Sequence, residues 1–385
     1  MSTGALDWLE EHFPRDFFDE TVAQRALRHL GFNEKRALFS DDYVLQRTSE
    51  GFWYEFIVYE IMLELSLETD RIQSIVGKGA DASAYSVGMR PGQNGFYYSE
   101  RGSLTVRGNG QNIAEMDLLF VDGRGNMGFV EVITSAMELE KFYEEIHYKK
   151  TLLASLFGQE TVPFVLVSSV DVSRYDSILR IAEMPDSLIL ITNPMEEIRT
   201  LIYEGSLRRR PEKPGHHPKR IDLTSIRPRR PFDYKEIHDR NRDVVIRALL
   251  SCRDGGIAVI SSAINSLSKK IMLGTLGEAG VKAVLRDRKV RIKDTTLYAD
   301  DIKQRFSRVV IAFDIPAYTP VIYFKLKEKE VYLKLIQNAS GDLVFQGKRT
   351  PAPYMSGFYE WLDADKPTVD SRVAERYASL FLGTS

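Results

Sequence analysis

The stretch that decides the fold is residues 112–135, which read NIAEMDLLFVDGRGNMGFVEVITS. Two apolar runs of strand-like composition flank Asp122–Asn126, a segment rich in the residues that favour turns. The stretch therefore predicts a β-hairpin centred on Arg124. Because the side chains of a strand alternate between its two faces, Asp117 and Glu131 are expected directly opposite each other, about 5 Å apart.

Two carboxylates at this separation repel each other unless a positive charge lies between them. A divalent cation is the usual solution, and Mg²⁺ prefers hard oxygen ligands from one or two carboxylates. The alternative is that Asp117 and Glu131 lie on the solvent-facing side of the hairpin. Their apolar neighbours argue against it, because an isolated ionised carboxylate is costly in apolar surroundings; these neighbours are Met116, Leu118, Leu119, Val130 and Val132.

The elements around this hairpin can be placed from the spacing of apolar residues. Residues 51–66 have the periodicity of a well-buried helix, and strand-like runs separated by glycine fill residues 72–121. A helix at 138–157, an apolar strand at 163–170, a further helix and a strand at 187–192 follow. This order predicts an α/β fold of the α+β type, a mixed β-sheet with flanking helices.

Composition also divides the chain. We expect an N-terminal helical cap at 1–50 and the core around the hairpin at 51–206. Residues 207–231 contain nine Lys or Arg, two acidic residues and five Pro, which is typical of a linker. This linker could also be a basic arm that contacts phosphates. A second α+β domain is expected at 232–385, and its basic segment 282–293 could be either a nucleic-acid-binding strand or a charged edge strand.

The sequence resembles the PD-(D/E)xK nuclease superfamily. The matching pieces are Glu55 in GFWYEFIV, Asp117 in EMDLLFVD and Glu131 in GFVEVITS, followed by the helix at 138–157 and the strand at 163–170. The resemblance implies a restriction-endonuclease-like αβββαβ core over less than half of the chain.

It also implies a role for each matching residue. Asp117, Glu131 and the Val132 carbonyl would hold Mg²⁺ or Mn²⁺, and Glu55 would assist from its helix. The activity would be metal-assisted hydrolysis of phosphodiester bonds. Nucleic acid is the expected partner, with DNA ahead of RNA.

One departure from the family pattern concerns a lysine. The family places lysine two residues after the glutamate Glu131, where this chain has Ile133. A lysine on the following helix could replace it. Lys150 falls near the centre of the apolar stripe of that helix, Lys149 falls at its edge, and Lys141 points to the opposite side. We therefore predict Lys150, then Lys149, as the replacement; the alternative is a pair at the helix rim whose ammonium groups reach water.

The totals exclude several classes of protein. With 385 residues and a net charge of −2, the chain is not a globally basic protein of the histone type. Its one cysteine, Cys252, cannot form an internal disulfide, which favours a reducing, cytoplasmic setting. The acidic N-terminus does not have the pattern of a signal peptide, and no run approaches the ~20 apolar residues of a membrane span.

Three functions are compatible with these observations. The first is a metal-dependent nuclease, for which a homodimer would match the two antiparallel strands of DNA. The second is a catalytically inactive nuclease-like module that binds nucleic acid or a protein partner, since the motif lysine is missing. The third is a regulatory or assembly protein without a nucleic-acid role.

Overall fold

The computed structural model separates the chain into two compact units. Unit 1 takes residues 1–87, 95–106 and 114–232, and unit 2 takes residues 88–94, 107–113 and 233–385. The residues that the structure describes are 4–15, 19–82, 94–99, 102–108, 111–137, 139–203, 205, 216–229, 232–251, 264, 267–285, 288–292, 295–297, 301, 306–315, 319–327, 331–351 and 367–382.

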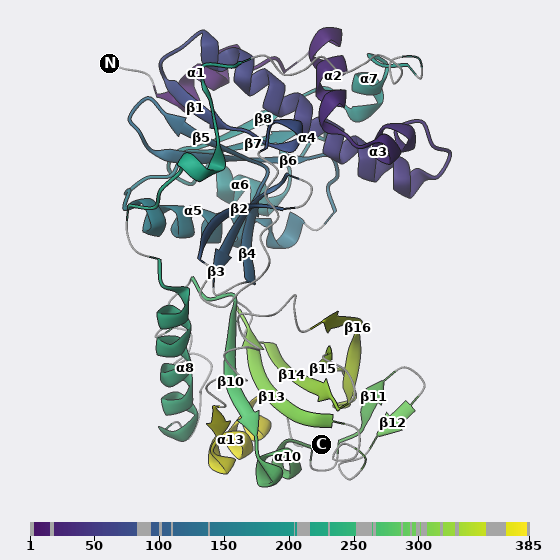
Figure 1. The fold of residues 1–385 in the computed structure, drawn as a ribbon, viewed down its shortest axis with the longest axis vertical. Coiled ribbons are helices and arrows are strands. Elements are labelled where there is room, and N and C mark those ends of the chain that lie inside the picture. Colours follow the sequence, from purple (N-terminus) through teal and green to yellow (C-terminus); the bar gives the residue numbers. More distant parts are fainter. Residues whose placement is uncertain are drawn as a thin grey trace. The chain divides into compact units, whose positions relative to one another are not determined.

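Helices begin unit 1 and cover one side of its core (Figure 1). The longest, α4, is largely buried and begins earlier than the helix predicted at 51–66. The Asp42 side chain accepts the N–H groups of Val44 and Leu45 and so caps the helix there. The helical bounds are α1 Ala5–His12, α2 Glu20–Ala26, the 3₁₀ turn η1 Leu27–His29, α3 Phe32–Ala37 and α4 Tyr43–Leu67.

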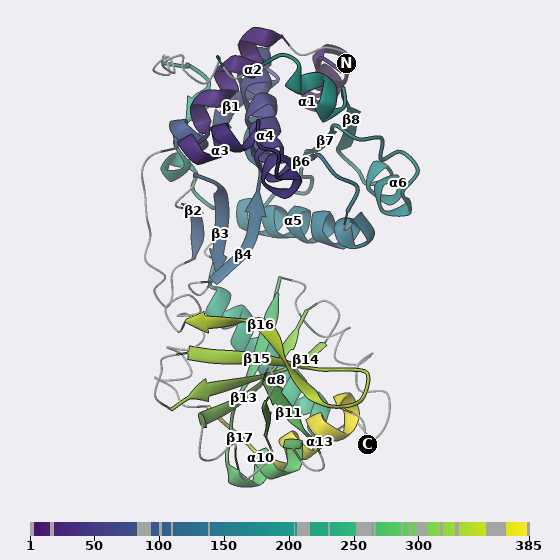
Figure 2. The ribbon, with the colours of Figure 1, turned by 90° about the vertical axis from the view of Figure 1, so that its right-hand side faces the viewer.

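A six-stranded mixed sheet follows, in the order β8-β7-β6-β5-β1-β9. Strands β1, β5 and β6 pair antiparallel, whereas β6, β7 and β8 pair in parallel, and β9 lies parallel to β1. The strands are β1 Ile72–Val76, β5 Leu118–Asp122, β6 Met127–Ile133, β7 Phe164–Ser168, β8 Ser187–Ile191 and β9 Arg220–Ile221; the helices among them are η3 Leu139–Lys141, α5 Phe142–Phe157, α6 Asp176–Ala182 and α7 Met195–Arg199. The predicted mixed sheet with flanking helices is confirmed (Figures 1 and 2).

The hairpin centred on Arg124 is confirmed, because Leu118 pairs with Val130 and Phe120 with Gly128. The prediction of one continuous first strand is wrong. A bend at Asp117 divides it into β5 and β4 Gln111–Met116, which joins a three-stranded sheet with β2 Gly95–Tyr98 and β3 Leu104–Gly108. The Asp117 side chain binds a backbone N–H group across the hairpin instead of standing in a regular ladder.

Part of the predicted linker 207–231 belongs to this sheet. Strand β9 lies at the sheet edge, and the nearby side chains of Leu223 and Ile226 are buried. Residues 216–229 are therefore packed into unit 1, while 206–215, 230 and 231 lie outside the described residues.

Unit 2 is an α+β unit whose main sheet has the order β12-β11-β16-β15-β14-β13-β10-β17. The segment 282–293 is not one basic strand: it ends a helix and enters β11, where Arg291 pairs with Asp342 at 3.0 Å. The elements are α8 Tyr234–Ser251, β10 Lys270–Leu276, α10 Glu278–Leu285, β11 Val290–Ile292, β12 Thr295–Leu297, β13 Phe306–Asp314, β14 Thr319–Leu326, β15 Val331–Gln337, β16 Leu343–Pro351, β17 Thr368–Val369 and α13 Ser371–Phe381. Among the described residues, no helix has the length and apolar character needed to cross a membrane.

A tight turn after β1 generates the first prediction. Gly79 has φ +57°, and a Cβ added there would lie 2.5 Å from the Phe56 ring and 2.9 Å from His29 Nδ1. We expect Gly79→Ala to lower the free energy of unfolding by about 1–3 kcal/mol, measured by urea denaturation. Gly125→Ala is the control, because Gly125 also has positive φ but an added Cβ would have no atom within 4 Å. Equal losses in the two variants would show that contact with Phe56 and His29 is unimportant.

Candidate metal centre

Asp117 and Glu131 meet where the β5–β6 hairpin opens. Continuing the register of Leu118 with Val130 places the two residues opposite each other. Asp117 Oδ2 accepts the backbone N–H of Val132 at 2.7 Å. This bond fixes the Asp117 carboxylate beside β6.

Glu131 is buried in the sheet, with only 7% of the residue exposed. Its Oε2 lies 2.8 Å from Lys149 Nζ, whereas its buried Oε1 has no hydrogen-bond partner among the described residues. Burial raises the pKa of Glu131 to about 8; the charge of Asp117 adds to this effect, and Lys149 opposes it. The ionised carboxylate thus lacks part of the positive charge that its surroundings require.

Lys149 projects from α5 toward this carboxylate and is 4% exposed. It also pairs with Glu145 one turn earlier at 2.9 Å. Burial by itself lowers the pKa of Lys149, but the charges of Glu131 and Glu145 outweigh burial and raise it overall. Lys149 is therefore an ammonium at neutral pH.

Lys150 does not reach the centre, so the prediction that ranked it ahead of Lys149 is wrong. Its Nζ donates to the carbonyls of Pro185 at 2.6 Å and Asp186 at 3.1 Å, and to Ser187 Oγ at 2.9 Å. Consecutive helical residues point about 100° apart, and the flexible stem of a lysine decides where its ammonium ends. The head of Lys150 ends at the start of β8.

Glu55 and Lys78 extend the centre toward α4. Lys78 Nζ lies 2.7 Å from Glu55 Oε2, and Lys78 is buried. Burial raises the pKa of Glu55 to about 7, Lys78 opposes the shift, and the charge of Asp117 adds to it, so Glu55 lies within the electrostatic reach of Asp117. Sequence reasoning did not find Lys78; its position between two glycines directly after an apolar strand was the available signal.

The side chains fit a divalent cation. When all are ionised, the carboxylates of Glu55, Asp117 and Glu131 outnumber the two ammonium groups of Lys78 and Lys149, and burial raises the pKa of both Glu55 and Glu131. The buried Glu131 Oε1 is an oxygen donor without a partner among the described residues. An all-oxygen donor set of this kind suits Mg²⁺ or Mn²⁺. Val132 pairs with Val167 in the ladder of β6 and β7, and the predicted role of its carbonyl as a ligand stays a prediction.

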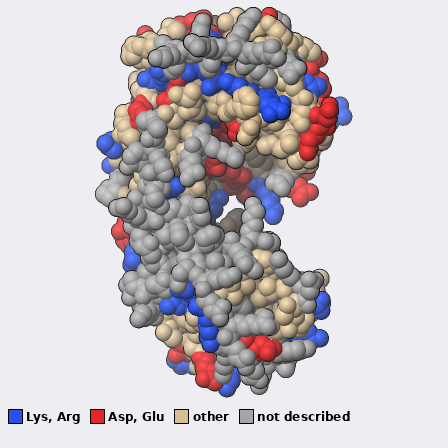
Figure 3. Space-filling model, turned by 45° about the vertical axis from the view of Figure 1, so that its right-hand side comes forward, with Lys and Arg blue, Asp and Glu red and all other residues tan. Residues whose placement is uncertain are grey.

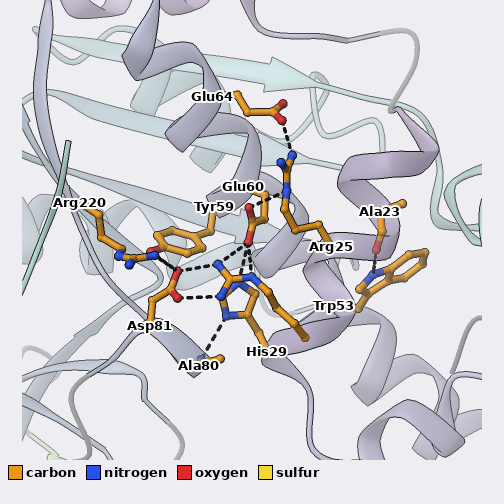
Figure 4. Close-up of polar contacts among 11 residues, drawn as sticks. Ala23, Arg25, His29, Trp53, Tyr59, Glu60, Glu64, Ala80, Asp81 and Arg220 are labelled. Carbon is orange, nitrogen blue, oxygen red and sulfur yellow. Dashed lines mark hydrogen bonds and ion pairs between the residues drawn. The ribbon is translucent and has the colours of Figure 1, made fainter. Parts of the chain in front are cut away.

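A second acidic cluster has a different character (Figure 4). Ligand atoms of His29, Glu60 and Asp81 lie within 4.8 Å of one another. Arginines already neutralise both carboxylates: Arg28 binds Glu60 at 2.8 Å and Asp81 at 2.6 Å, Arg25 binds Glu60 at 2.9 Å, and Arg220 binds Asp81 at 3.0 Å.

Both nitrogens of the His29 ring are also used. Nδ1 accepts the N–H of Ala80 at 3.1 Å, so the proton is on Nε2, which donates to Glu60 at 2.8 Å. Burial and the charge of Arg28 lower the pKa of His29, which keeps the ring neutral. With its charges matched and its lone pairs engaged, this cluster is a structural brace that joins η1 and α4 to the turn after β1 and to β9.

Surface charge does not by itself identify a nucleic-acid-binding face. In the view of Figure 3, Lys and Arg as well as Asp and Glu occur on the described surface. Two basic residues of the predicted linker also serve the fold, because Lys219 Nζ donates to the carbonyls of Thr69 and Ile72 while Arg220 binds Asp81.

Comparisons of this chain with protein-family models, with curated proteins and with solved structures found no match.

The structural role of the brace can be tested at Arg28, whose side chain is buried between Glu60 and Asp81. We expect Arg28→Met to lower the free energy of unfolding by about 3–5 kcal/mol, because it leaves two buried carboxylates short of charge. Urea denaturation with and without Mg²⁺ measures this loss, and the exposed Arg240→Met is the control. Stabilisation by Mg²⁺ that disappears in Asp81→Asn would instead make the cluster a metal site.

The pKa of Glu131 predicts how stability depends on pH. The ordinary value of 4.5 is raised to about 8 in the folded protein, so folding favours the protonated form. This contribution is complete below about pH 4.5 and is lost as pH rises to about 8. Melting temperatures in EDTA should therefore fall between pH 6 and pH 8.5, and less so in Glu131→Gln. Mg²⁺ should recover more of the loss at pH 8.5 than at pH 6. Identical pH profiles for wild type and variant would contradict the assignment.

Proposed function

We propose that the chain is a metal-dependent nuclease that hydrolyses phosphodiester bonds, with DNA as substrate. The observation that supports this best is the Glu131 carboxylate, which has one oxygen 2.8 Å from Lys149 Nζ and the other buried without a partner among the described residues. Asp117 lies across the hairpin from it. Two carboxylates and an ammonium grouped in this way are suited to hold a cation and a phosphate together.

The order of elements supports the same proposal. Helix α4, strands β1, β5 and β6, helix α5 and strand β7 follow one another as expected for the restriction-endonuclease-like αβββαβ core. Strands β2 to β4 are inserted between β1 and β5. Lys149 supplies from α5 the positive charge that the family supplies from the position of Ile133.

The ligands proposed for Mg²⁺ or Mn²⁺ are Asp117, Glu131 and the Val132 carbonyl, with Glu55 assisting from α4. When bound, the metal polarises a phosphoryl oxygen and lowers the pKa of a water molecule. The reaction joins the water oxygen to phosphorus and breaks the bond from phosphorus to the leaving sugar oxygen; the attacking water loses one proton, and the leaving oxygen takes up one proton from solvent water.

The charge states of Lys149, Glu55 and Lys78 suggest a different role for each residue. Lys149 remains protonated, so it stabilises the negative charge that develops on the phosphate and cannot accept the proton of water. Burial raises the pKa of Glu55 to about 7 in the metal-free protein, so Glu55 assists as the carboxylate that accepts that proton and does not bond directly to the cation. Lys78 holds Glu55 in place through the 2.7 Å ion pair.

The second candidate function is a nuclease-like module that binds nucleic acid or a protein partner without cutting. Ile133 at the family's lysine position favours it. The single cysteine of the chain fits a cytoplasmic setting for either function.

Neighbouring lysines on α5 provide a matched test of the nuclease. We expect Lys149→Met to slow cleavage of linear DNA by about 10²-fold or more, because it removes a positive charge from the reacting phosphate. Lys150→Met should leave the rate near that of wild type, because its ammonium binds the Pro185–Ser187 backbone turn. Cleavage is measured on labelled single- and double-stranded DNA and RNA with Mg²⁺, Mn²⁺ or EDTA.

The Asp117→Asn, Glu131→Gln double variant completes the series and should be inactive. Folded wild-type protein that cuts none of these substrates would refute the nuclease. Binding that then survives in EDTA would support the non-cutting module. Equal activity of Lys149→Met and wild type would refute the role given to Lys149.

A further inference from the structure

A pocket of about 580 Å³ lies beside helices α3 and α4 of unit 1. Phe32 of α3 and Phe52 and Phe56 of α4 contribute aromatic rings to its lining. Glu55 and Lys78 contribute the charged pair described above. The volume is within the range of pockets that bind small organic groups.

The three rings differ in how much of their surface is exposed. Phe56 is a buried wall, because the His29 ring stacks on it at 4.6 Å and Lys78 Nζ lies 5.1 Å from its centroid. Phe52 is half-buried, and Phe32 is 74% exposed. The exposed ring of Phe32 therefore provides a flat apolar surface at the mouth of the pocket.

The pocket and the candidate metal centre share Glu55 and its partner Lys78. Glu55 lines the pocket and is also close enough to Asp117 for the charge of Asp117 to act on it. Helix α4 reaches the end of β6, since a Cβ added at Gly51 would lie 3.6 Å from Thr134 Oγ1. A DNA strand that places one phosphate at the carboxylates of the candidate metal centre would thus have the aromatic pocket beside that phosphate.

We propose that this pocket holds one unstacked base of the substrate, next to the phosphate at the metal centre, so that the substrate is an unpaired DNA strand. This proposal rests on the proposed nuclease function. Aromatic rings are the usual platforms for the bases of single strands, since every base offers a flat face. Arg36, 5.8 Å from the Phe32 ring centroid, adds the positive charge that such platforms use to hold the backbone.

The pocket selects against a paired strand for an energetic reason. A base inside a duplex is stacked and paired, and removing it costs a few kcal/mol. A base in a single strand enters the pocket at a lower cost. The preference for unpaired DNA therefore follows from the cost of taking a paired base out of the duplex to reach the rings of the pocket.

The test measures binding by fluorescence anisotropy in the full chain carrying Asp117→Asn and Glu131→Gln. These two substitutions remove the proposed metal ligands, so the variant is not expected to cut the probe, and binding can be measured without metal. The probes are a fluorescein-labelled DNA strand of about 20 nucleotides and the same strand paired with its complement. We expect the single strand to bind more tightly than the duplex. Phe32→Ala should weaken single-strand binding by about 5- to 150-fold, as expected for the loss of one stacked base.

Matched variants separate stacking from general apolar contact. Phe32→Trp should retain tight binding, because it keeps a flat ring. Tyr43→Ala is the control: Tyr43 is also exposed on a helix and has Arg47 5.3 Å from its ring, but it does not line the pocket. It should leave binding unchanged. The exposure of Phe32 makes these substitutions compatible with folding, which a thermal melt verifies.

The outcomes also separate this proposal from the nuclease itself. If binding of the single strand depends on Phe32 but the wild-type protein cuts no substrate, the pocket is supported and the nuclease is refuted. Cutting by the wild-type protein together with equal binding by Phe32→Ala and its parent would support the nuclease and overturn the pocket. Equal or tighter binding of the duplex, or no binding of either probe, would also overturn it.

Discussion

The Glu131 carboxylate imposes the constraint on which the candidate centre depends. It lies within β6, between β5 and β7, in a sheet interior that is mostly apolar. An ionised carboxylate in such a position is costly unless it is paired. Lys149 meets this requirement for one oxygen only, at 2.8 Å. The need for a partner at the first oxygen explains why α5 presents its lysine here. The other oxygen, Oε1, has no hydrogen-bond partner among the described residues, which is why the site favours a cation.

The brace around Glu60 and Asp81, in the same unit, is a cluster in which the charges of the buried carboxylates are fully paired. There, Arg25, Arg28 and Arg220 surround the two carboxylates, and His29 is held neutral by its hydrogen bonds. Both clusters combine buried acids and bases. Burial raises the pKa of Glu131, whereas at Glu60 and Asp81 the neighbouring charges and hydrogen bonds outweigh burial and lower the pKa. Geometry alone would rank the brace as the better metal site, because its ligand atoms lie within 4.8 Å of one another. The charge balance reverses that ranking.

The sequence could predict those features that follow from local periodicity. Turn residues around Arg124 and strand alternation place Asp117 opposite Glu131, and the register agrees. The bend at Asp117 was not predictable in this way, because the strand leaves one sheet for another in response to a tertiary bond with Val132. A helical wheel likewise places Lys149 and Lys150 near the same stripe. It cannot tell where each long side chain ends, since that depends on partners from β6 and from the start of β8.

Lys78 links the centre to the aromatic pocket and shows why one helix serves both. Residues three or four positions apart share one face of a helix, so Phe52, Glu55 and Phe56 all line the pocket. The charge of Asp117 also acts on Glu55. Lys78 contacts both sets, through its ion pair with Glu55 and its position over the Phe56 ring. The left-handed conformation of Gly79 lets the turn after β1 pack closely enough on Phe56 for both contacts to form. A change in this turn would therefore displace both Lys78, which restrains Glu55, and Phe56, which forms a wall of the pocket. Two sites that differ in chemistry are thus coupled through one buried lysine.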